Sequence, residues 1–314
     1  MTALVFTRTG TGPPLVLLHG LGLSSRSWEP VIPALAERFD VVAIDLPGFG
    51  RSAMLPREVE PHPAALAGAV ADLLDEIGID AAHTVGNSLG GWVALELAQI
   101  RATLSVTLLS PAGLWRRNTP LYNRISLRVS RSASRRAPTL LSRLVDHRLG
   151  RVVVLSQTHA RPAQMRPEAA RAVISDLSNG PGFETVFRAT ARRRYLAGTG
   201  FDAPVTIAFG SKDRLLLRRQ SRHLDQLPTD TTVFAADGCG HVPMNDDPAA
   251  VVAFIIASTA HRPGHSSVTT SAHATTPAVG RVQRTDIHDD ELTNRTPQPT
   301  TSRQTAVRAP TTAP

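Results

Sequence analysis

Residues 85–95 read Val85-Gly-Asn-Ser-Leu-Gly-Gly-Trp-Val-Ala-Leu95, an apolar strand that passes into an apolar helix through one tight turn. Glycine stands two residues before and two residues after Ser88, so the turn has the pattern G-x-S-x-G. A serine on such a turn takes a strained backbone conformation, and the flanking glycines let the strand and the helix approach each other. The turn therefore predicts a projecting hydroxyl at Ser88 that a base can reach.

Three further segments come in the order that serine-based catalysis on one known fold requires. Residues 15–22 form an apolar strand with a glycine-rich loop, which is suited to aiming a backbone N–H at a developing oxyanion. Residues 205–213 form another apolar strand with a carboxylate, Asp213, just past its end. A short strand at residues 232–235 leads to His241 on a glycine-rich loop. Serine, aspartate and histidine in this chain order are typical of that fold.

Over about residues 3–258 the chain resembles α/β-hydrolases. The resemblance includes the four segments above and residues 45–52, Asp45-Leu-Pro-Gly-Phe-Gly-Arg-Ser52, which are similar to a loop of that family. It implies that the nucleophile is Ser88, the base His241, the orienting acid Asp213, and the oxyanion hole the backbone N–H groups of Leu21 and Leu89.

The other titratable groups near these positions have plainer interpretations. A serine hydroxyl needs a base at neutral pH, and glycines around His241 free the backbone to project its ring. We expect His19 to pack or hydrogen-bond within its own loop rather than to act as the base. Asp246 and Asp247 are expected to face solvent or to cap the helix that starts near Pro248. Cys239 is interpreted as a small packing residue.

The order of apolar strands and helical stretches predicts a mainly parallel, doubly wound sheet that is covered on both faces. The alternation stops at residues 114–200, where helical patterns prevail and residues 152–155 are the one possible strand. This range corresponds to the lid that similar α/β-hydrolases insert over the site. The predicted organisation is a core in two parts at 1–113 and 201–260, a helical cap at 114–200, and a disordered tail at 261–314.

Positive charge is concentrated in the predicted cap. The chain has 34 cationic and 26 acidic residues, whereas residues 114–200 hold 17 arginines against four acids. Helical spacing groups part of this charge on one face and apolar residues on another: Arg124, Arg128, Arg131 and Arg135, with Leu121, Ile125 and Val129 alongside. The pattern fits either peripheral contact with an anionic membrane and acidic, lipid-like substrates, or a solvated arginine face. No nucleic-acid partner is expected.

Several function classes are excluded or disfavoured by composition. A single cysteine rules out an internal disulfide, and no cysteine or histidine array suggests a metal site. No apolar run approaches the ~18 residues of a membrane span, and residues 1–11 lack a secretory signal pattern. We therefore expect a cytoplasmic protein that uses neither a cofactor nor a metal.

The predicted reaction is hydrolysis of a carboxylic ester, or a related acyl bond, through an acyl-enzyme on Ser88. The partner is then a small-molecule acyl substrate. One alternative is a C–C bond hydrolase of the meta-cleavage type, which residues 86–91 resemble, although Val242 stands where tryptophan usually follows the histidine. A cofactor-free haloperoxidase and an acyltransferase also remain open on this scaffold. From a different class, a catalytically silent binding protein would have the same fold.

Overall fold

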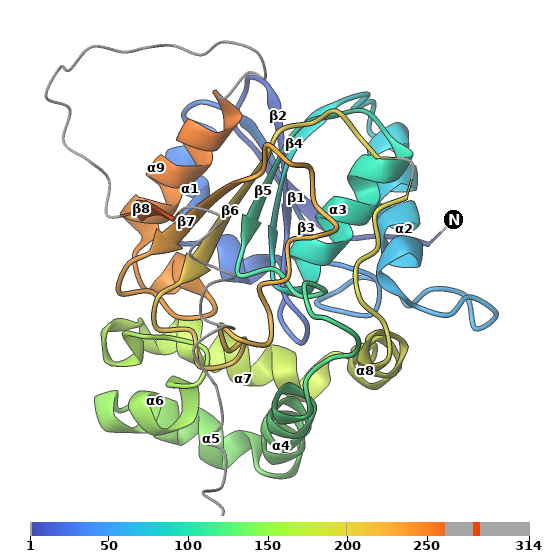
Figure 1. The fold of residues 1–314 in the computed structure, drawn as a ribbon. Helices are drawn as coiled ribbons and strands as arrows, with labels where there is room; N and C mark the ends of the chain where they lie inside the picture. Colours follow the sequence, from blue (N-terminus) through green and yellow to red (C-terminus); the bar gives the residue numbers. More distant parts are fainter. Residues whose placement is uncertain (1, 199, 261–278, 283–314) are drawn as a thin grey trace, which may run out of the picture. The chain divides into compact units, whose positions relative to one another are not determined.

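A computed structural model of the chain describes residues 2–198, 200–260 and 279–282. Its eight-stranded sheet has the order β1-β3-β2-β4-β5-β6-β7-β8 (Figure 1). Neighbouring strands from β3 to β7 run parallel, and β1 and β8 pair antiparallel at the two edges. The strands are β1 (Phe6–Thr9), β2 (Pro14–Leu18), β3 (Asp40–Ile44), β4 (Ala82–Asn87), β5 (Thr103–Leu109), β6 (Val205–Gly210), β7 (Thr232–Ala236) and β8 (Val279–Val282).

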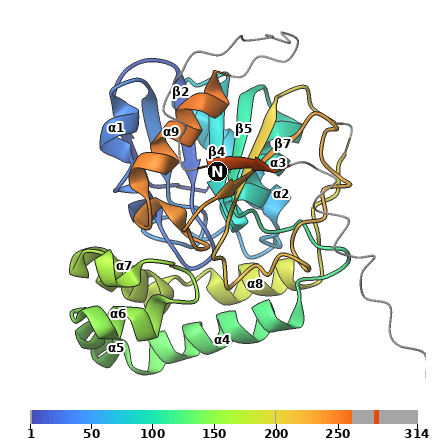
Figure 2. The same cartoon turned by 60° about the vertical axis from the view of Figure 1, so that its left-hand side comes forward.

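Helices cover both faces of the sheet because its central strands are apolar on both sides. In β2, residues 15–18 are all fully buried, and every residue of β3 is buried. Helices α1 and α9 lie on one face, and α2 and α3 lie on the other (Figures 1 and 2). This confirms the predicted doubly wound sheet. These helices are α1 (Ile32–Ala36), α2 (Pro63–Glu76), α3 (Leu89–Ile100) and α9 (Pro248–Thr259), with short 3-10 turns η1 (Ser25–Trp28), η2 (Pro162–Gln164) and η3 (Pro243–Asn245).

Five helices lie between β5 and β6 and form what we call the helical segment. They lie together below the sheet in Figures 1 and 2, apart from the helices that cover its two faces. The prediction of a possible strand at residues 152–155 is wrong, because these residues form the C-terminal turn of α6. Arg151 and Leu155, four residues apart, point inward there, while Val152 and Val153 are exposed. The helices are α4 (Leu121–Arg136), α5 (Pro138–Val145), α6 (Arg148–Leu155), α7 (Pro167–Asn179) and α8 (Phe183–Ala191).

Most of the predicted tail, residues 261–278 and 283–314, lies outside the described residues. At residues 279–282 the chain forms β8, which pairs with β7 and was not part of the tail prediction. No helix in the described part of the chain has the length and the apolar character needed to cross a membrane.

Candidate active site

Ser88 stands on the turn between β4 and α3, as the sequence predicts. Its backbone angles are φ 54° and ψ −115°, a conformation that a non-glycine residue rarely takes. The close approach requires both flanking glycines: a Cβ on Gly86 would lie 2.2 Å from the carbonyl oxygen of Gly90, and a Cβ on Gly90 would lie 2.1 Å from that of Leu18. The strained serine is therefore held by strand, helix and neighbouring strand together.

His241 and Asp213 form a buried pair, with both side chains 3% exposed. The Nδ1 atom of His241 lies 2.8 Å from Oδ2 of Asp213. The other carboxylate oxygen, Oδ1, accepts hydrogen bonds of 2.8 Å from the backbone N–H groups of Leu215 and Leu216. With Nδ1 occupied by the carboxylate, Nε2 is the ring nitrogen that remains for proton exchange.

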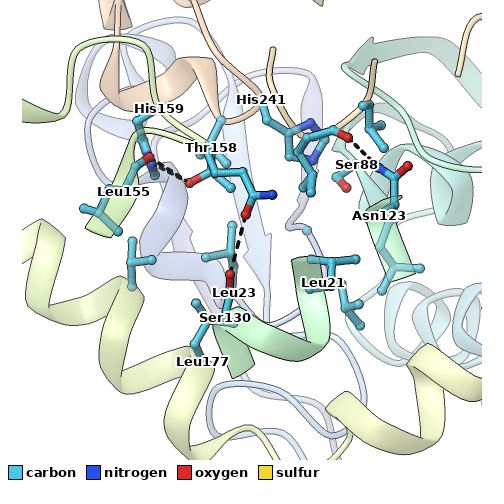
Figure 3. A pocket seen from close by; sticks show the side chains of 18 of the residues that line it. Leu21, Leu23, Ser88, Asn123, Ser130, Leu155, Thr158, His159, Leu177 and His241 are labelled. Carbon is cyan, nitrogen blue, oxygen red and sulfur yellow. Dashed lines mark hydrogen bonds between the residues drawn. The ribbon is translucent and has the colours of Figure 1, made fainter. Parts of the chain in front are cut away.

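Asn87 joins the loop of His241 to the serine turn. Its Nδ2 group donates one 2.9 Å hydrogen bond to the carbonyl of Leu109 and another to the carbonyl of His241. Ser88, the next residue, and His241 line the same pocket (Figure 3). The structure thus brings Ser88 and His241, which are more than a hundred residues apart in the sequence, to the same pocket.

Leu21 and Leu89 both line this pocket. Leu89 is the first residue of α3, where the helix dipole places partial positive charge. The loop of Leu21 passes close to the serine, since a Cβ on Gly20 would lie 3.3 Å from the Cβ of Ser88. Neither amide donates a hydrogen bond to another described residue.

His19 is buried and works within its own loop. Its Nδ1 lies 2.8 Å from the carbonyl oxygen of Gly20, and its Nε2 accepts a 3.0 Å hydrogen bond from the backbone N–H of Leu46. Burial lowers the pKa of His19, and Nε2 must be unprotonated to accept the hydrogen bond from Leu46. With both nitrogens occupied, it positions the loop beside Ser88 rather than acting as a base.

Asp246 corrects one of our expectations, because it neither faces solvent nor caps a helix. It is buried and accepts hydrogen bonds from the backbone N–H groups of Gly240 (2.7 Å), Ala160 (2.9 Å) and Arg161 (2.7 Å). It thereby fixes the residue before His241 to the chain that follows α6. Its neighbour Asp247 does cap α9, accepting from the N–H of Ala250.

His159 is a pocket residue that the sequence reasoning missed. It is buried beside the pocket, and its Nδ1 lies 2.9 Å from Oγ1 of Thr158 (Figure 3). Its Nε2 has no hydrogen-bond partner among the described residues. Burial lowers the pKa of His159 to about 4, the charge of nearby His241 also lowers it, and the charge of Asp246 opposes the change. No local pattern around His159 distinguishes it from a surface histidine.

Cys239 is buried in the apolar core. Burial raises the pKa of its thiol to about 12, so the thiol is protonated and a poor nucleophile. This agrees with a packing role. Among the described residues, no group of three or more histidine, cysteine, aspartate or glutamate side chains is placed to hold a metal ion.

The pocket has a volume of about 390 Å³ and a mostly apolar wall. Its floor comes from loops at the carboxyl ends of the strands, and its other walls come from the helical segment. The rings of Trp92 and Trp115 meet edge to face there, with centroids 5.6 Å apart. Further apolar lining comes from Leu23, Leu177, Phe187 and Leu216.

Comparisons with known proteins agree with this fold. Residues 15–254 match the sequence profile of the Alpha/beta hydrolase family. A pimeloyl-[acyl-carrier protein] methyl ester esterase of Aeromonas hydrophila is 50% identical over 91 residues, 29% of this chain and 34% of that protein. An epoxide hydrolase of Mycobacterium tuberculosis is 32% identical over 207 residues, 61% of this chain and 92% of that protein.

A solved structure, a thermophilic esterase from Thermogutta terrifontis, has the same fold, with a TM-score of 0.65 at 21% identity. The match covers 82% of this chain and 92% of the esterase. With its doubly wound sheet, its serine turn and the match over most of its length, the chain belongs to the alpha/beta hydrolase family and is a hydrolase.

Proposed function

We propose that this protein hydrolyses a carboxylic ester through an acyl-enzyme on Ser88. The observation that carries the proposal is the buried His241–Asp213 hydrogen bond, which leaves Nε2 of the histidine at the pocket that Ser88 lines. A serine hydroxyl becomes a useful nucleophile when a positioned base takes its proton. His241 would be that base, and Asp213 would hold its ring in the correct tautomer.

In the proposed reaction, Oγ of Ser88 attacks the ester carbonyl carbon while its proton passes to Nε2 of His241. The N–H groups of Leu21 and Leu89 stabilise the oxyanion of the tetrahedral intermediate. The C–O bond to the alcohol then breaks, and His241 returns the proton to the leaving alkoxide. A water molecule, deprotonated by His241, attacks the acyl-enzyme. The carboxylic acid leaves, and Ser88 regains its proton.

The pocket supports an ester with an apolar group. Its wall is built from leucine, tryptophan and phenylalanine side chains, and burying apolar substrate surface against them favours binding. The helical segment serves in this proposal as the cap over the site. Two of the similar proteins are esterases, which favours an ester over the other acyl bonds.

Ser88→Ala tests the proposal, with Ser130→Ala as its matched control. Ser130 also lines the pocket but lies on α4, away from the turn. We expect Ser88→Ala to lower kcat on a short-chain p-nitrophenyl ester at least about a thousandfold and to abolish labelling by a fluorophosphonate probe. Ser130→Ala should retain both. Full activity of purified Ser88→Ala would contradict the mechanism, and an unreactive wild-type protein would favour the silent binding protein.

A further inference from the structure

Helix α4 buries a polar stripe and exposes an apolar one. Asn123 and Ser134 are buried. Leu121, Ile125 and Val129, one turn apart along the opposite side, are 66%, 54% and 61% exposed. A surface helix of a globular protein normally has the reverse arrangement. The apolar stripe is therefore available to a partner.

The polar stripe is held by hydrogen bonds to its neighbours, so the orientation of α4 is determined by the fold. Arg131 donates to the backbone carbonyls of Leu177 and Gly180, and its guanidinium lies 5.2 Å from the ring centre of Phe183. Ser178 donates to the carbonyl of Ser134. The expectation that Arg131 shares one outward basic face is wrong, because it is buried.

The exposed apolar surface continues from α4 onto α5 and α6. Leu149 and Val153 of α6 are 81% and 80% exposed. Three of the exposed residues, Val129, Leu144 and Val153, come from the three helices and also line the pocket. The pocket therefore opens between these helices. We call this surface the apolar face, and it consists of Leu121, Ile125, Val129, Leu140, Leu144, Leu149, Val152 and Val153.

Exposed arginines lie on the helices that carry the apolar face. Residues 121–155 contain eight arginines, of which Arg131 and Arg151 are buried, and a single acidic residue, Asp146, which pairs with Arg171. Arg128 and Arg135 are exposed beside the apolar stripe of α4. Two copies of this surface would repel each other, whereas a bilayer with anionic headgroups would accept both the leucines and the arginines. The charge thus argues for a lipid surface rather than a second copy of the chain.

We propose that the apolar face lies on an anionic lipid surface, so that the acyl chain of a lipid ester passes from the bilayer into the pocket between α4, α5 and α6. The substrate class rests on the proposed ester hydrolysis, whereas the docking does not require catalysis. The contact combines shallow insertion of apolar side chains with attraction between arginines and lipid phosphates. Both contributions are needed for stable binding.

Vesicle sedimentation with the Ser88→Ala protein measures docking without turnover. We expect binding to vesicles of phosphatidylcholine mixed with phosphatidylglycerol, and at least tenfold weaker binding to phosphatidylcholine alone. The docking variant Leu121→Ser/Ile125→Ser/Leu149→Ser avoids the pocket lining and should bind the anionic vesicles at least about tenfold more weakly. Its control is Ile100→Ser/Leu104→Ser, at exposed apolar positions outside the helical segment, which should bind like the parent.

Hydrolysis assays with the native serine separate the two proposals. If the wild-type protein binds anionic vesicles but cleaves no ester, the proposed function fails and the docking stands. If it cleaves a soluble ester but does not sediment with vesicles, the docking is overturned and the function stands. Equal binding to neutral vesicles would also overturn the docking proposal. So would a dimer in light scattering that the docking variant converts to a monomer, because a second copy would then cover the face.

Discussion

Strands β2 and β3 of the sheet bury nearly all their apolar side chains, whereas α4 of the helical segment buries Asn123 and exposes Ile125. In the first region the hydrophobic effect and the hydrogen bonds of the sheet act together to hold the site residues still. In the second, hydrogen bonds to neighbouring backbone carbonyls orient the helix, and apolar surface remains exposed. The comparison indicates a division of roles. The sheet holds the candidate catalytic residues in place, and the helical segment presents exposed apolar surface to a partner.

The largest expected effect lies in the sheet region. Asp213→Asn should lower kcat on a soluble ester at least about a thousandfold, because an amide favours the wrong tautomer of His241. The fold should persist, since an asparagine oxygen can still accept from the N–H groups of Leu215 and Leu216. Steady-state kinetics and circular dichroism measure both quantities.

Asp246→Asn is the matched control, because Asp246 is also buried and bonded to backbone N–H groups. We expect a loss of about 1–3 kcal/mol in the free energy of unfolding but a change in kcat of less than about tenfold. If Asp246→Asn lowered kcat more than Asp213→Asn, the assignment of the orienting acid would be wrong.

The next prediction concerns the stability at acidic pH that depends on His159, which is buried beside the pocket. Burial lowers the pKa of His159 from 6.5 to about 4, so between these values the unfolded chain binds a proton that the folded protein does not. The contribution of neutral His159 to the free energy of unfolding is complete above about pH 6.5, and it falls as the pH falls toward 4. Urea unfolding at pH 7.5 and pH 4.5 should show a loss for the wild type that is about 2–3 kcal/mol larger than for His159→Gln.

The His159→Gln variant will still lose some free energy of unfolding between pH 7.5 and pH 4.5, because burial also lowers the pKa of His19. The readout is therefore the difference between the two proteins rather than the slope of either one. Identical losses of unfolding free energy in wild type and variant would show that His159 is not a buried neutral group.

Within the helical segment, two arginines of α4 should behave differently. Arg131→Gln leaves the buried carbonyls of Leu177 and Gly180 without their donor and should cost about 1–3 kcal/mol of unfolding free energy. Arg128 is exposed and stacks on Phe187, so Arg128→Gln should cost less than about 1 kcal/mol. Equal costs would contradict the observed orientation of α4.

The smallest effect on the free energy of unfolding is expected at the apolar stripe of α4. Ile125→Ser should change the free energy of unfolding by less than about 0.5 kcal/mol, because about half of the Ile125 surface is already exposed to solvent in the folded protein. The corresponding sheet variant, Val16→Ala, should cost more than about 1 kcal/mol, since Val16 is fully buried. Thermal melting distinguishes the two, and a costly Ile125→Ser would mean that α4 packs its apolar stripe inward.

The same contrast explains what the sequence could predict. Strands, the serine turn and its glycines have local signatures, so the sequence alone predicts that Ser88, Asp213 and His241 follow the ends of strands. Helical spacing also groups the residues of α4 into faces, but it does not say which face is buried. That depends on partners such as the carbonyl of Leu177, which are distant in sequence.

Two other misses have the same origin. The apolar run at residues 152–155 is as compatible with a strand as with a helix, and only the packing of α6 decides between them. The role of Asp246 comes from three backbone N–H groups, two of them more than eighty residues away. Neither arrangement leaves a signature in the adjacent sequence.

The most direct test of the account is the mass spectrum of the protein after reaction with a fluorophosphonate. The account predicts a single adduct, located by peptide mapping on Ser88 and absent from both Ser88→Ala and the denatured protein. Ester hydrolysis without an adduct at Ser88, or an adduct on another residue that alone abolishes hydrolysis, would contradict it.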